Sequence, residues 1–354
     1  MKTILSIDGG GIKGIIPGMV LVELEERLKQ RTGNAEAHIA DYFDFFAGTS
    51  TGGILTCLLL CPSKDDPKKP RFTAKQALDL YIANGAKIFE TKGIKKVFAD
   101  IGWVTERYDA EFLEKILLQY FEDVKLSELI KPCIITAYNI ELRKAHIFRQ
   151  KTAKSRGIHR DFYVRDVCRA TSAAPTYFSV AEIYSLAGVR YPLLDGGIFA
   201  TNPSLSAFVE IKREPEQEFE PNDIHILSLG TGVSKQSYDS DELRDTKALF
   251  VVPALLDMMM GAATETSHFY MKQIFSYLGI PDHYVRIEPM NLQSVQERMD
   301  AASPKNIQKL MALADRMISQ RHQVLDVIVD NLIKLKINRD LDAEGKAITR
   351  RLAR

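Results

Sequence analysis

Several features that mark specialised classes of protein are scarce in this sequence of 354 residues. An excess of one charge is lacking, because 47 basic residues face 46 acidic ones and the formal net charge is only +1. Such a balance gives no overall field that would attract nucleic acid, so no nucleic-acid partner is expected. Cysteine is scarce as well, since only Cys57, Cys61, Cys133 and Cys168 occur, without the paired spacing of metal ligands. We therefore expect reduced thiols in an intracellular protein, and no bound metal.

Long hydrophobic runs are also missing. The longest apolar stretches fall far short of the ~20 residues that a membrane-spanning helix needs. At the N-terminus, Asp8 interrupts the apolar run after a few residues, which is not typical of a secretory signal peptide. No internal repeat or low-complexity linker divides the chain, and no G-x-x-x-x-G-K-[ST] motif is present, which excludes a Walker-type ATPase. The sequence thus predicts a soluble, cytoplasmic protein whose contact with a membrane would be peripheral.

Strand-like and helix-like segments alternate along the chain. Buried strands are expected at 3–8, 43–47, 133–138, 191–194 and 224–230, with a hairpin partner at 145–148 and a late strand at 284–287. Helical periodicity predicts helices at 15–31, 54–60, 73–89, 109–121, 164–172 and 248–275, and a long C-terminal helix, broken once, across 307–332. This alternation is typical of an α/β fold with a central, mostly parallel sheet and helices on both faces.

The stretch 45–53, F-F-A-G-T-S-T-G-G, combines the end of a buried strand, a sharp turn and the start of a helix. Ser50 lies between Gly48 and Gly52 in a G-x-S-x-G pattern, which is the strand–turn–helix context of a nucleophile elbow. In such a turn the hydroxyl is exposed above the sheet, and a side chain at either glycine would collide with the neighbouring strand or helix. The positive end of the following helix favours negative charge at Ser50. An ordinary glycine-rich turn is the alternative, but this context favours a nucleophilic serine.

A second glycine-rich turn, G-G-G-I-K-G at 9–14, follows the first predicted strand and precedes the first predicted helix. It fits G-x-G-x-x-G, so a dinucleotide-binding turn is an alternative. That alternative needs a strand ending in Asp or Glu about 20 residues further on, whereas residues 33–38 are polar and strand-poor. The backbone N–H groups of Gly9, Gly10 and Gly11, at a helix N-terminus, are instead suited to stabilise an oxyanion. Together with Ser50 they would form half of an acyl-transfer site.

A serine nucleophile needs a base. Asp195 ends a predicted strand, and the two glycines after it, Gly196 and Gly197, let its carboxylate approach another loop closely, although D-G-G is also common in turns. In the hydrolase order Ser–Asp–His, the histidines after Asp195 are alternative bases. None of them stands in a glycine-bounded turn at the end of a strand, so each is better explained as a packed or surface residue. They are His225, His268, His283 and His322.

Four motifs occur in the order of one known family, namely 8–14 (D-G-G-G-I-K-G), 48–53 (G-T-S-T-G-G), 170–178 (A-T-S-A-A-P-T-Y-F) and 195–197 (D-G-G). With S-L-G-T-G at 228–232, the sequence from residue 3 to about 232 closely resembles the patatin-like phospholipases, and the resemblance is looser beyond 233. It implies a patatin-like variant of the α/β-hydrolase fold with a catalytic dyad that lacks histidine. In this resemblance Ser50 is the nucleophile, Asp195 is the base, the amides of Gly9 to Gly11 form the oxyanion hole, and the supporting motif positions are Lys13, Gly14, Gly48, Gly52, Gly196 and Gly197.

The resemblance also implies an activity. The family cleaves fatty-acyl esters of phospholipids and other lipids without calcium or a cofactor, so we expect a lipid acyl hydrolase of phospholipase A type that forms an acyl-enzyme. Plant patatins also serve as storage proteins, and some bacterial relatives are antiphage effectors that cyclic nucleotides activate. A storage or binding protein with incidental esterase activity, and a nucleotide-activated effector, are therefore the alternatives. The expected partner is membrane phospholipid or another acyl lipid, with a small-nucleotide activator only in the effector alternative.

The whole chain, 1–354, is expected to form a single domain. Its catalytic core would cover about 3–232, with insertions near 62–108 and 140–160, followed by a helical part at about 246–335 and a basic tail at 336–354. The stretch 143–160 contains seven basic residues and no acidic one. A solvated face is the plain explanation, and a patch facing an anionic bilayer is the alternative. Apolar insertion near Trp103 would be another route to a membrane.

Overall fold

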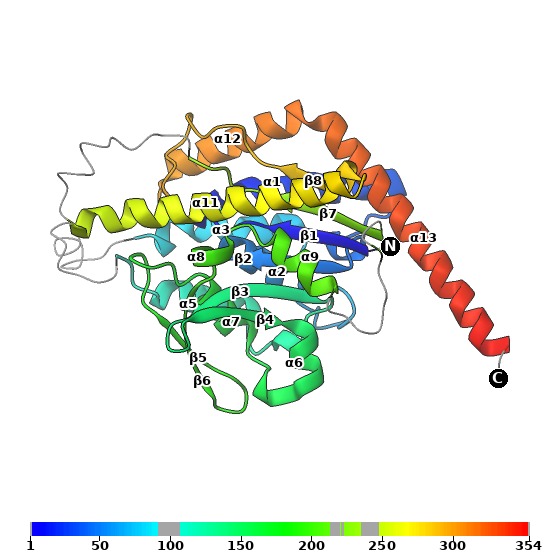
Figure 1. The fold of residues 1–354 in the computed structure, drawn as a ribbon, viewed down its shortest axis with the longest axis horizontal. Helices are drawn as coiled ribbons and strands as arrows, with labels where there is room; N and C mark the ends of the chain where they lie inside the picture. The colour runs from blue at the N-terminus through cyan, green and yellow to red at the C-terminus, as the bar shows by residue number, and fades with distance from the viewer. Residues whose placement is uncertain (1, 91–106, 213–219, 221–222, 235–247, 353–354) are drawn as a thin grey trace.

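The computed structural model describes residues 2–90, 107–212, 220, 223–234 and 248–352 of the chain (Figure 1). Its strands form one eight-stranded sheet in the order β5-β6-β3-β2-β1-β7-β8, with β4 paired to β3 beside this path. The strands are β1 (Lys2–Ile7), β2 (Phe45–Thr49), β3 (Cys133–Asn139), β4 (Lys144–Arg149), β5 (Ala181–Tyr184), β6 (Arg190–Asp195), β7 (Ile224–Leu229) and β8 (Tyr284–Ile287).

The centre of the sheet is parallel. Strands β3, β2, β1, β7 and β8 all run in one direction, whereas β4 and β6 lie antiparallel to β3, and β5 forms an antiparallel pair with β6. The predicted α/β fold with a mostly parallel sheet is therefore confirmed. The sequence does not predict the short strand β5, because its four residues, which alternate between buried and exposed, are too few for a clear period.

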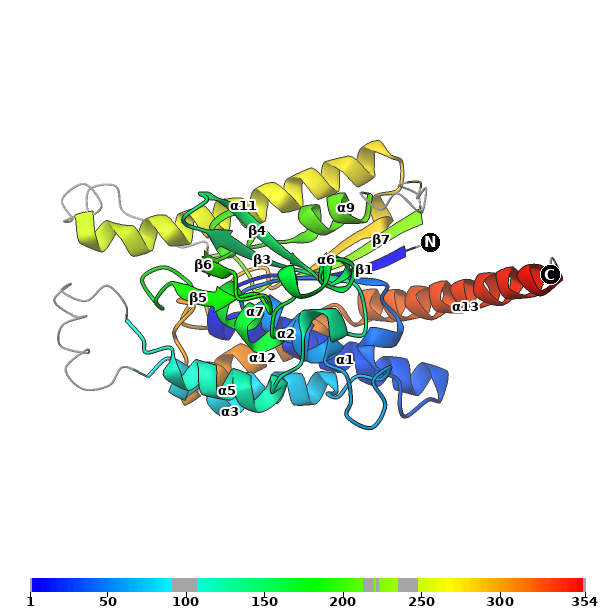
Figure 2. The same ribbon diagram turned by 90° about the horizontal axis from the view of Figure 1, so that it is seen from below.

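Helices cover both faces of the sheet. Figure 2 shows α9 and α11 on one side, and α1, α2, α3, α5 and α12 on the other. The helices are α1 (Ile15–Thr32), α2 (Thr51–Leu60), α3 (Ala74–Ile88), α5 (Glu111–Phe121), α6 (Gln150–Arg156), α7 (Val164–Thr171), α8 (Gly197–Ala200), α9 (Ser204–Lys212), α11 (Ala248–Tyr277), α12 (Pro304–Gln320) and α13 (His322–Leu352). Among the described residues, no helix is both long enough and apolar enough to cross a membrane.

Alternation of side chains along the strands builds two cores. Ile4 and Phe45 pack in the smaller core with α9 and α11, whereas the next residues, Leu5 and Phe46, pack in the larger core on the opposite face. Successive side chains of a strand point to opposite faces of the sheet, so each central strand contributes to both cores. This double burial is the reason that the central strands read as continuous apolar runs in the sequence.

Most of the predicted elements are present, with differences at their ends. Strand β2 begins at Phe45 rather than at 43, and the expected break in the C-terminal helix lies at Arg321, between α12 and α13. Helix α12 begins where Ser303 accepts a hydrogen bond from the Asn306 backbone and Pro304 occupies the first turn. Helix α13 continues through most of the basic tail. The short helices α6, α8 and α9 were not predicted.

The sheet brings the expected site residues to one edge. Strands β1 and β2 are parallel neighbours with Ile7 opposite Gly48, so the loops that follow them leave the sheet side by side. On the other side of β2, Thr49 lies opposite Thr136 of β3, and the next residue of β3 is paired with Asp195. The register therefore places Asp195 at the level of Ser50, with one strand, β3, paired to both β6 and β2.

Candidate functional site

Ser50 occupies the turn between β2 and α2. Its backbone has φ 53° and ψ −123°, which is rare for a residue with a side chain, and α2 starts at the next residue. A buried threonine holds this conformation, because the Thr171 Oγ1 accepts a hydrogen bond from the Ser50 N–H at 2.8 Å and donates to the Thr136 carbonyl at 2.7 Å. The expectation that the serine hydroxyl would be exposed is wrong: Ser50 is only 7% exposed. It lies on the wall of a cavity instead of at the surface.

The glycines around Ser50 are required by close approach of backbone. A Cβ at Gly52 would lie 2.1 Å from the Ile7 carbonyl oxygen of β1, and a Cβ at Gly48 would lie 2.4 Å from the Gly52 carbonyl oxygen of α2. Gly14 is packed against the same turn, since its Cβ would lie 2.1 Å from Thr51 Oγ1. Any larger residue would separate β1, β2 and α2, and with them the two turns of the site.

The glycine loop 9–11 lies directly against Ser50. A Cβ at Gly9 would be 3.2 Å from the Ser50 Cβ. The Gly9 N–H, however, donates to the Thr201 carbonyl at 2.9 Å, so the expected contribution of this amide to an oxyanion hole is not available in this arrangement. Neither the Gly10 nor the Gly11 amide donates to another described residue. Gly11 adopts φ +60°, and a Cβ there would lie 2.2 Å from the Met299 carbonyl oxygen, so only glycine fits.

Asp195 is held beside Ser50 by its backbone and by the start of α8. Its N–H donates to the Ala173 carbonyl at 3.0 Å, and its Oδ1 accepts from the Gly197 N–H at 2.7 Å. Its Oδ2 is buried and has no hydrogen-bond partner of standard geometry among the described residues. Burial raises the pKa of Asp195 to about 7, against the lowering effects of the Ser50 hydroxyl and the Gly197 amide. The carboxyl group can therefore gain and lose a proton near neutral pH.

The two glycines after Asp195 also permit close packing. A Cβ at Gly196 would lie 2.1 Å from Thr136 Oγ1, and one at Gly197 would lie 2.7 Å from Met260 Cε of α11. Close packing of this kind fixes the carboxylate between β3 and α11. Asp195 is 1% exposed, so water has little access to it from solvent.

An apolar cavity of about 50 Å³ adjoins Ser50. Its wall combines residues of the glycine loop, α2, α3 and the 170–178 motif, among them Ile12, Ile54, Leu80, Ile88, Ala174, Tyr177 and Phe178. The 170–178 motif, which was noticed only through the family resemblance, thus has three structural roles. It supplies Thr171 to the Ser50 amide, the Ala173 carbonyl to Asp195, and one wall of this cavity.

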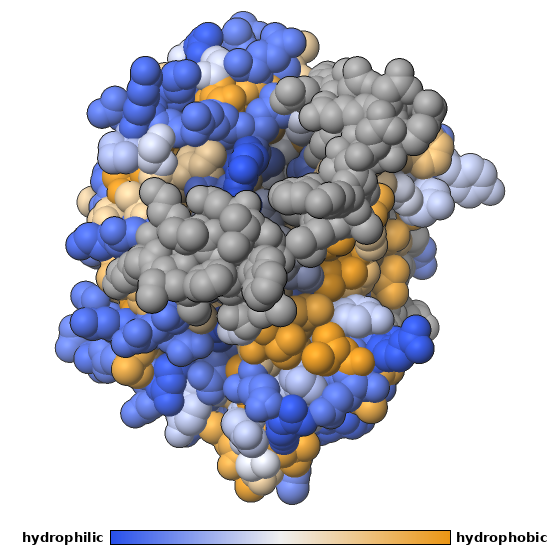
Figure 3. Space-filling view, turned by 90° about the vertical axis from the view of Figure 1, so that its left-hand side faces the viewer, coloured by the Kyte–Doolittle hydropathy of each residue, from blue (hydrophilic) through white to orange (hydrophobic). Residues whose placement is uncertain are grey.

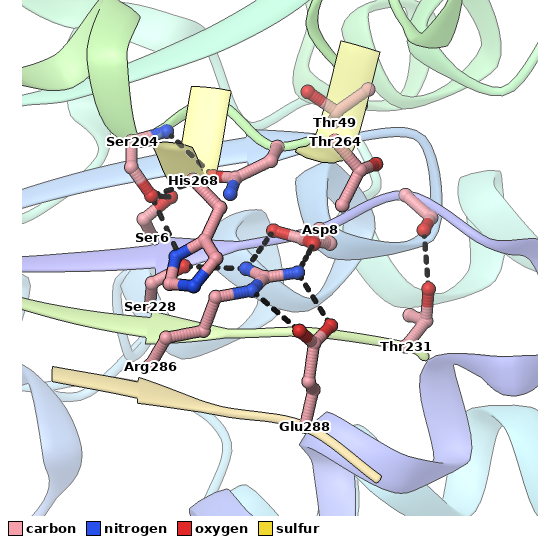
Figure 4. A network of polar contacts seen from close by, with 12 residues as sticks. Ser6, Asp8, Thr49, Ser204, Ser228, Thr231, Thr264, His268, Arg286 and Glu288 are labelled. Carbon is pink, nitrogen blue, oxygen red and sulfur yellow. Dashed lines mark hydrogen bonds and ion pairs between the residues drawn. The ribbon is translucent and has the colours of Figure 1, made fainter. Parts of the chain in front are cut away.

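A buried charge network supports the other side of the glycine loop (Figure 4). Arg286 of β8 is paired with Asp8 at 2.6 Å and with Glu288 at 2.7 Å, and it donates to Ser228 Oγ at 2.7 Å. Burial raises the pKa of Asp8 to about 6, while the Arg286 guanidinium opposes this. The Thr231 hydroxyl donates to the Gly9 carbonyl at 2.7 Å. The loop is therefore anchored at Asp8 and at both polar groups of Gly9, which orients the next two amides.

The four histidines considered as alternative bases lie elsewhere. His225 of β7 stacks on His283, with ring centroids 3.7 Å apart. His268 of α11 contacts the Tyr284 hydroxyl at 3.1 Å, and His322, the first residue of α13, pairs with Asp326. No hydrogen bond or ring contact among the described residues joins any of them to Ser50 or Asp195. They are packing or surface residues, as the sequence favoured.

Two further expectations concerned membranes and metals. Strand β4 runs antiparallel to β3, so α6, with Lys151 and Lys154, lies at the end of the sheet remote from Ser50 (Figure 1). The start of the basic stretch 143–160 lies at the other end of β4, where Lys144 is paired with Asn139, so a contact of this stretch with an anionic bilayer stays a prediction. Trp103 lies outside the described residues. Within the described parts of the chain, no group of three or more His, Cys, Asp or Glu residues could hold a metal ion.

Several known proteins are similar to this chain. The family model for patatin-like phospholipases matches residues 5–208. Patatin-like protein 2 of Arabidopsis thaliana is 32% identical over 346 residues, which cover 90% of this chain and 83% of that protein. Patatin-like protein 1 of Oryza sativa subsp. indica is 30% identical over 342 residues, covering 90% and 81%. A Solanum tuberosum protein named probable inactive patatin-3-Kuras 1 is 29% identical over 368 residues, covering 98% and 96%. The structure of VipD from Legionella pneumophila aligns over 89% of this chain and 67% of that chain, with 12% identity and a TM-score of 0.33, which is too low to establish a shared fold.

Proposed function

The chain belongs to the patatin-like phospholipase family, and on this premise we propose that it is a lipid acyl hydrolase of phospholipase A type that works through Ser50 and Asp195. One observation carries the proposal. A serine held at φ 53° lies beside a buried carboxyl group whose Oδ2 has no other partner among the described residues. Because the Asp195 pKa is raised to about 7, this carboxyl group is suited to act as a base near neutral pH.

The proposed reaction has two halves. In the first, Asp195 takes the hydroxyl proton of Ser50 while Ser50 Oγ attacks the acyl carbon, and the amides of Gly10 and Gly11 donate to the oxyanion that forms. The tetrahedral intermediate then breaks its bond to the alcohol, which leaves with the proton from Asp195. In the second half, Asp195 takes a proton from water, the resulting hydroxide attacks the acyl-enzyme, and fatty acid leaves as Ser50 regains its proton. The positive end of α2 supports the negative charge in both halves.

The surroundings of Ser50 support a lipid substrate. The apolar cavity beside the serine is lined mainly by hydrocarbon and aromatic side chains, which suits an acyl chain. The end of the molecule where the parallel strands finish carries hydrophobic areas among polar ones (Figure 3). Helix α11, which packs on α8, exposes Val252, Leu255 and Met259 to solvent. An apolar helix face of this kind, close to the site, is suited to rest on a lipid surface, and we place the peripheral membrane contact there.

Family membership alone does not decide between an active hydrolase and a storage or binding protein, because one relative carries the name of a probable inactive patatin. The test is whether Ser50 reacts. We expect a fluorophosphonate probe to label the wild-type protein at Ser50, and Ser50→Ala to abolish both labelling and release of fatty acid from phospholipid micelles. Ser155→Ala, which removes an exposed hydroxyl on α6, should change neither. Unlabelled wild-type protein without lipase activity would contradict the proposal and favour the storage alternative.

A further inference from the structure

The loop that joins β8 to α12, residues 288–303, lies outside the stretch that the family model matches, yet it contacts the glycine loop. The Met299 carbonyl accepts a hydrogen bond from the Ile12 N–H at 2.9 Å, and it occupies the space where a Cβ of Gly11 would lie. The Met299 side chain lines the apolar cavity beside Ser50. Gly11, with φ +60°, is therefore held from outside by Met299, and the direction of its amide depends on where this loop lies.

Asn306, in the first turn of α12, closes the base of this loop. Its side-chain oxygen accepts from the Gln296 N–H at 2.8 Å. Its side-chain amide donates to the Gln296 carbonyl at 3.2 Å and to the Ala301 carbonyl at 2.7 Å. Asn306 is buried, so water does not compete for these hydrogen bonds. The segment 296–301 is thus a braced turn that holds Met299 against the glycine loop.

Asp300, the residue after Met299, ties this turn to another part of the site. Its carboxylate is buried, and it accepts from the Tyr108 hydroxyl at 2.7 Å and from the Arg107 guanidinium at 2.9 Å. The Arg298 guanidinium binds it from within the turn, at 2.7 Å and 3.0 Å. Hydrogen bonds from charged donors to a carboxylate are stronger than neutral ones. The buried carboxylate therefore links two segments that lie far apart in the sequence.

Arg107 and Tyr108 lie directly on the 170–178 motif. The Arg107 N–H donates to the Thr176 carbonyl at 3.1 Å, and the Tyr108 N–H donates to the Tyr177 carbonyl at 2.9 Å. The rings of Tyr108 and Tyr177 are stacked, with centroids 6.4 Å apart, and Tyr177 lines the apolar cavity. The same motif binds the backbone amides of both members of the proposed dyad. A continuous path of contacts therefore runs from the glycine loop, through the buried carboxylate, to the nucleophile.

We propose that Asp300 is a positioning residue for acyl transfer, because it fixes the distance between the glycine loop and the 170–178 motif across the apolar cavity. The assignment rests on the proposed function, since it treats the amides of the glycine loop as donors to the oxyanion. Loss of the carboxylate frees Met299 and lets the glycine loop move relative to Ser50. These amides act on the transition state, so their displacement lowers kcat and leaves substrate binding almost unchanged.

Kinetics on p-nitrophenyl butyrate separate positioning from a loss of stability. We expect Asp300→Ala to lower kcat at least ~10-fold, short of the ~100–1,000-fold that loss of an oxyanion donor costs, with little change in KM. Tyr108→Phe, which removes one donor to Asp300, should lower kcat by about threefold, and it keeps the test valid if Asp300→Ala does not fold. Asp161→Ala is the matched control, because Asp161 is equally buried and accepts from Ser127 and Phe162, away from the site. It should lose stability, but its folded fraction should keep the wild-type kcat.

Hydrogen exchange of the glycine loop gives a readout that does not depend on catalysis. Deuterium uptake would be followed by mass spectrometry on the peptide that covers residues 9–14. The Ile12 N–H in this peptide is bonded to Met299, so its protection depends on the braced turn. We expect exchange in Asp300→Ala to be at least ~5-fold faster than in wild type and in Asp161→Ala.

The two readouts separate this assignment from the hydrolase proposal. An active wild type, with unchanged kcat and exchange in Asp300→Ala and Tyr108→Phe, would overturn the positioning role while the hydrolase stands. Equal losses of kcat in Asp300→Ala and Asp161→Ala would overturn it too, because they would indicate a general loss of structure. A wild type without hydrolysis, but with faster exchange in Asp300→Ala, would overturn the hydrolase proposal and leave Asp300 as an anchor of the glycine loop.

Discussion

Replacing Asp195 by Asn should make the protein inactive and, above neutral pH, more stable. In the unfolded chain the Asp195 pKa is near 3.8, whereas burial raises it to about 7 in the folded protein. The carboxyl group therefore contributes stability that is fully present below pH 3.8 and is lost as the pH rises to about 7. The loss amounts to ~4 kcal/mol, because each pKa unit corresponds to 1.36 kcal/mol. Asn cannot ionise, so the variant avoids this loss while its side-chain oxygen can still accept from the Gly197 N–H.

Urea unfolding at pH 5 and pH 8 measures this effect. We expect the difference in unfolding free energy between Asp195→Asn and wild type to grow by ~2–4 kcal/mol between the two pH values. Asp8 also has a raised pKa, but it titrates in both proteins and cancels in the difference. Asp282→Asn provides a surface control that should show no such growth. A constant difference between Asp195→Asn and wild type across this range would refute the claim that Asp195 is held in a strongly desolvated position.

Three other changes test the parts of the site. Thr171→Val removes the hydrogen-bond partners of the Ser50 N–H and the Thr136 carbonyl, at ~1–3 kcal/mol each. We expect kcat to fall at least tenfold with little change in KM, whereas Thr171→Ser should keep most of the activity. Equal kinetics for the two variants would contradict this role of Thr171. Gly52→Ala forces a Cβ onto the Ile7 carbonyl oxygen, so thermal unfolding should show a large loss of protein stability. Gly33→Ala is the control, because Gly33 has φ +66° but open space around it, and this change should cost about 1 kcal/mol. Similar losses for the two variants would show that β1 and α2 can separate. Arg286→Met leaves Asp8 buried without its cation and should lower the free energy of unfolding in urea by ~3–5 kcal/mol. Adding Asp8→Asn should recover part of this loss. If the unfolding free energies of the two single variants simply add in the double variant, the pair does not couple.

The parts of the site that could be predicted from sequence are those where local chain geometry decides the residue. Gly48 and Gly52 were expected because a tight strand-to-helix turn leaves no room for a side chain, and the structure shows backbone oxygens where their Cβ atoms would be. The pairing of the glycine loop 9–11 with Ser50 was expected from the chemistry of acyl transfer, and the parallel register of β1 and β2 brings the two turns to the same edge of the sheet. The helices and strands with long, regular periods were predictable for a similar reason.

Contacts between distant segments could not be predicted. Thr171 supports Ser50 from 121 residues away, and Arg286 reaches Asp8 across 278 residues, so neither leaves a local pattern in the sequence. The use of the Gly9 amide by Thr201 depends on how the turn after α8 packs on β1, which no spacing rule gives. Burial of Ser50 has the same origin, because its cover comes from segments that follow much later in the chain.

The most direct test of the account is whether Asp195 alone serves Ser50 as base. Folded, purified variants would be compared by kcat/KM on the same phospholipid micelles. We expect Asp195→Asn to be as inactive as Ser50→Ala, because Asn keeps the shape of the side chain but cannot accept the serine proton. Four histidine variants, each to alanine, should retain substantial activity; they are His225→Ala, His268→Ala, His283→Ala and His322→Ala. An active Asp195→Asn, or one folded histidine variant as inactive as Ser50→Ala, would contradict the Ser–Asp dyad and indicate a hydrolase that uses histidine.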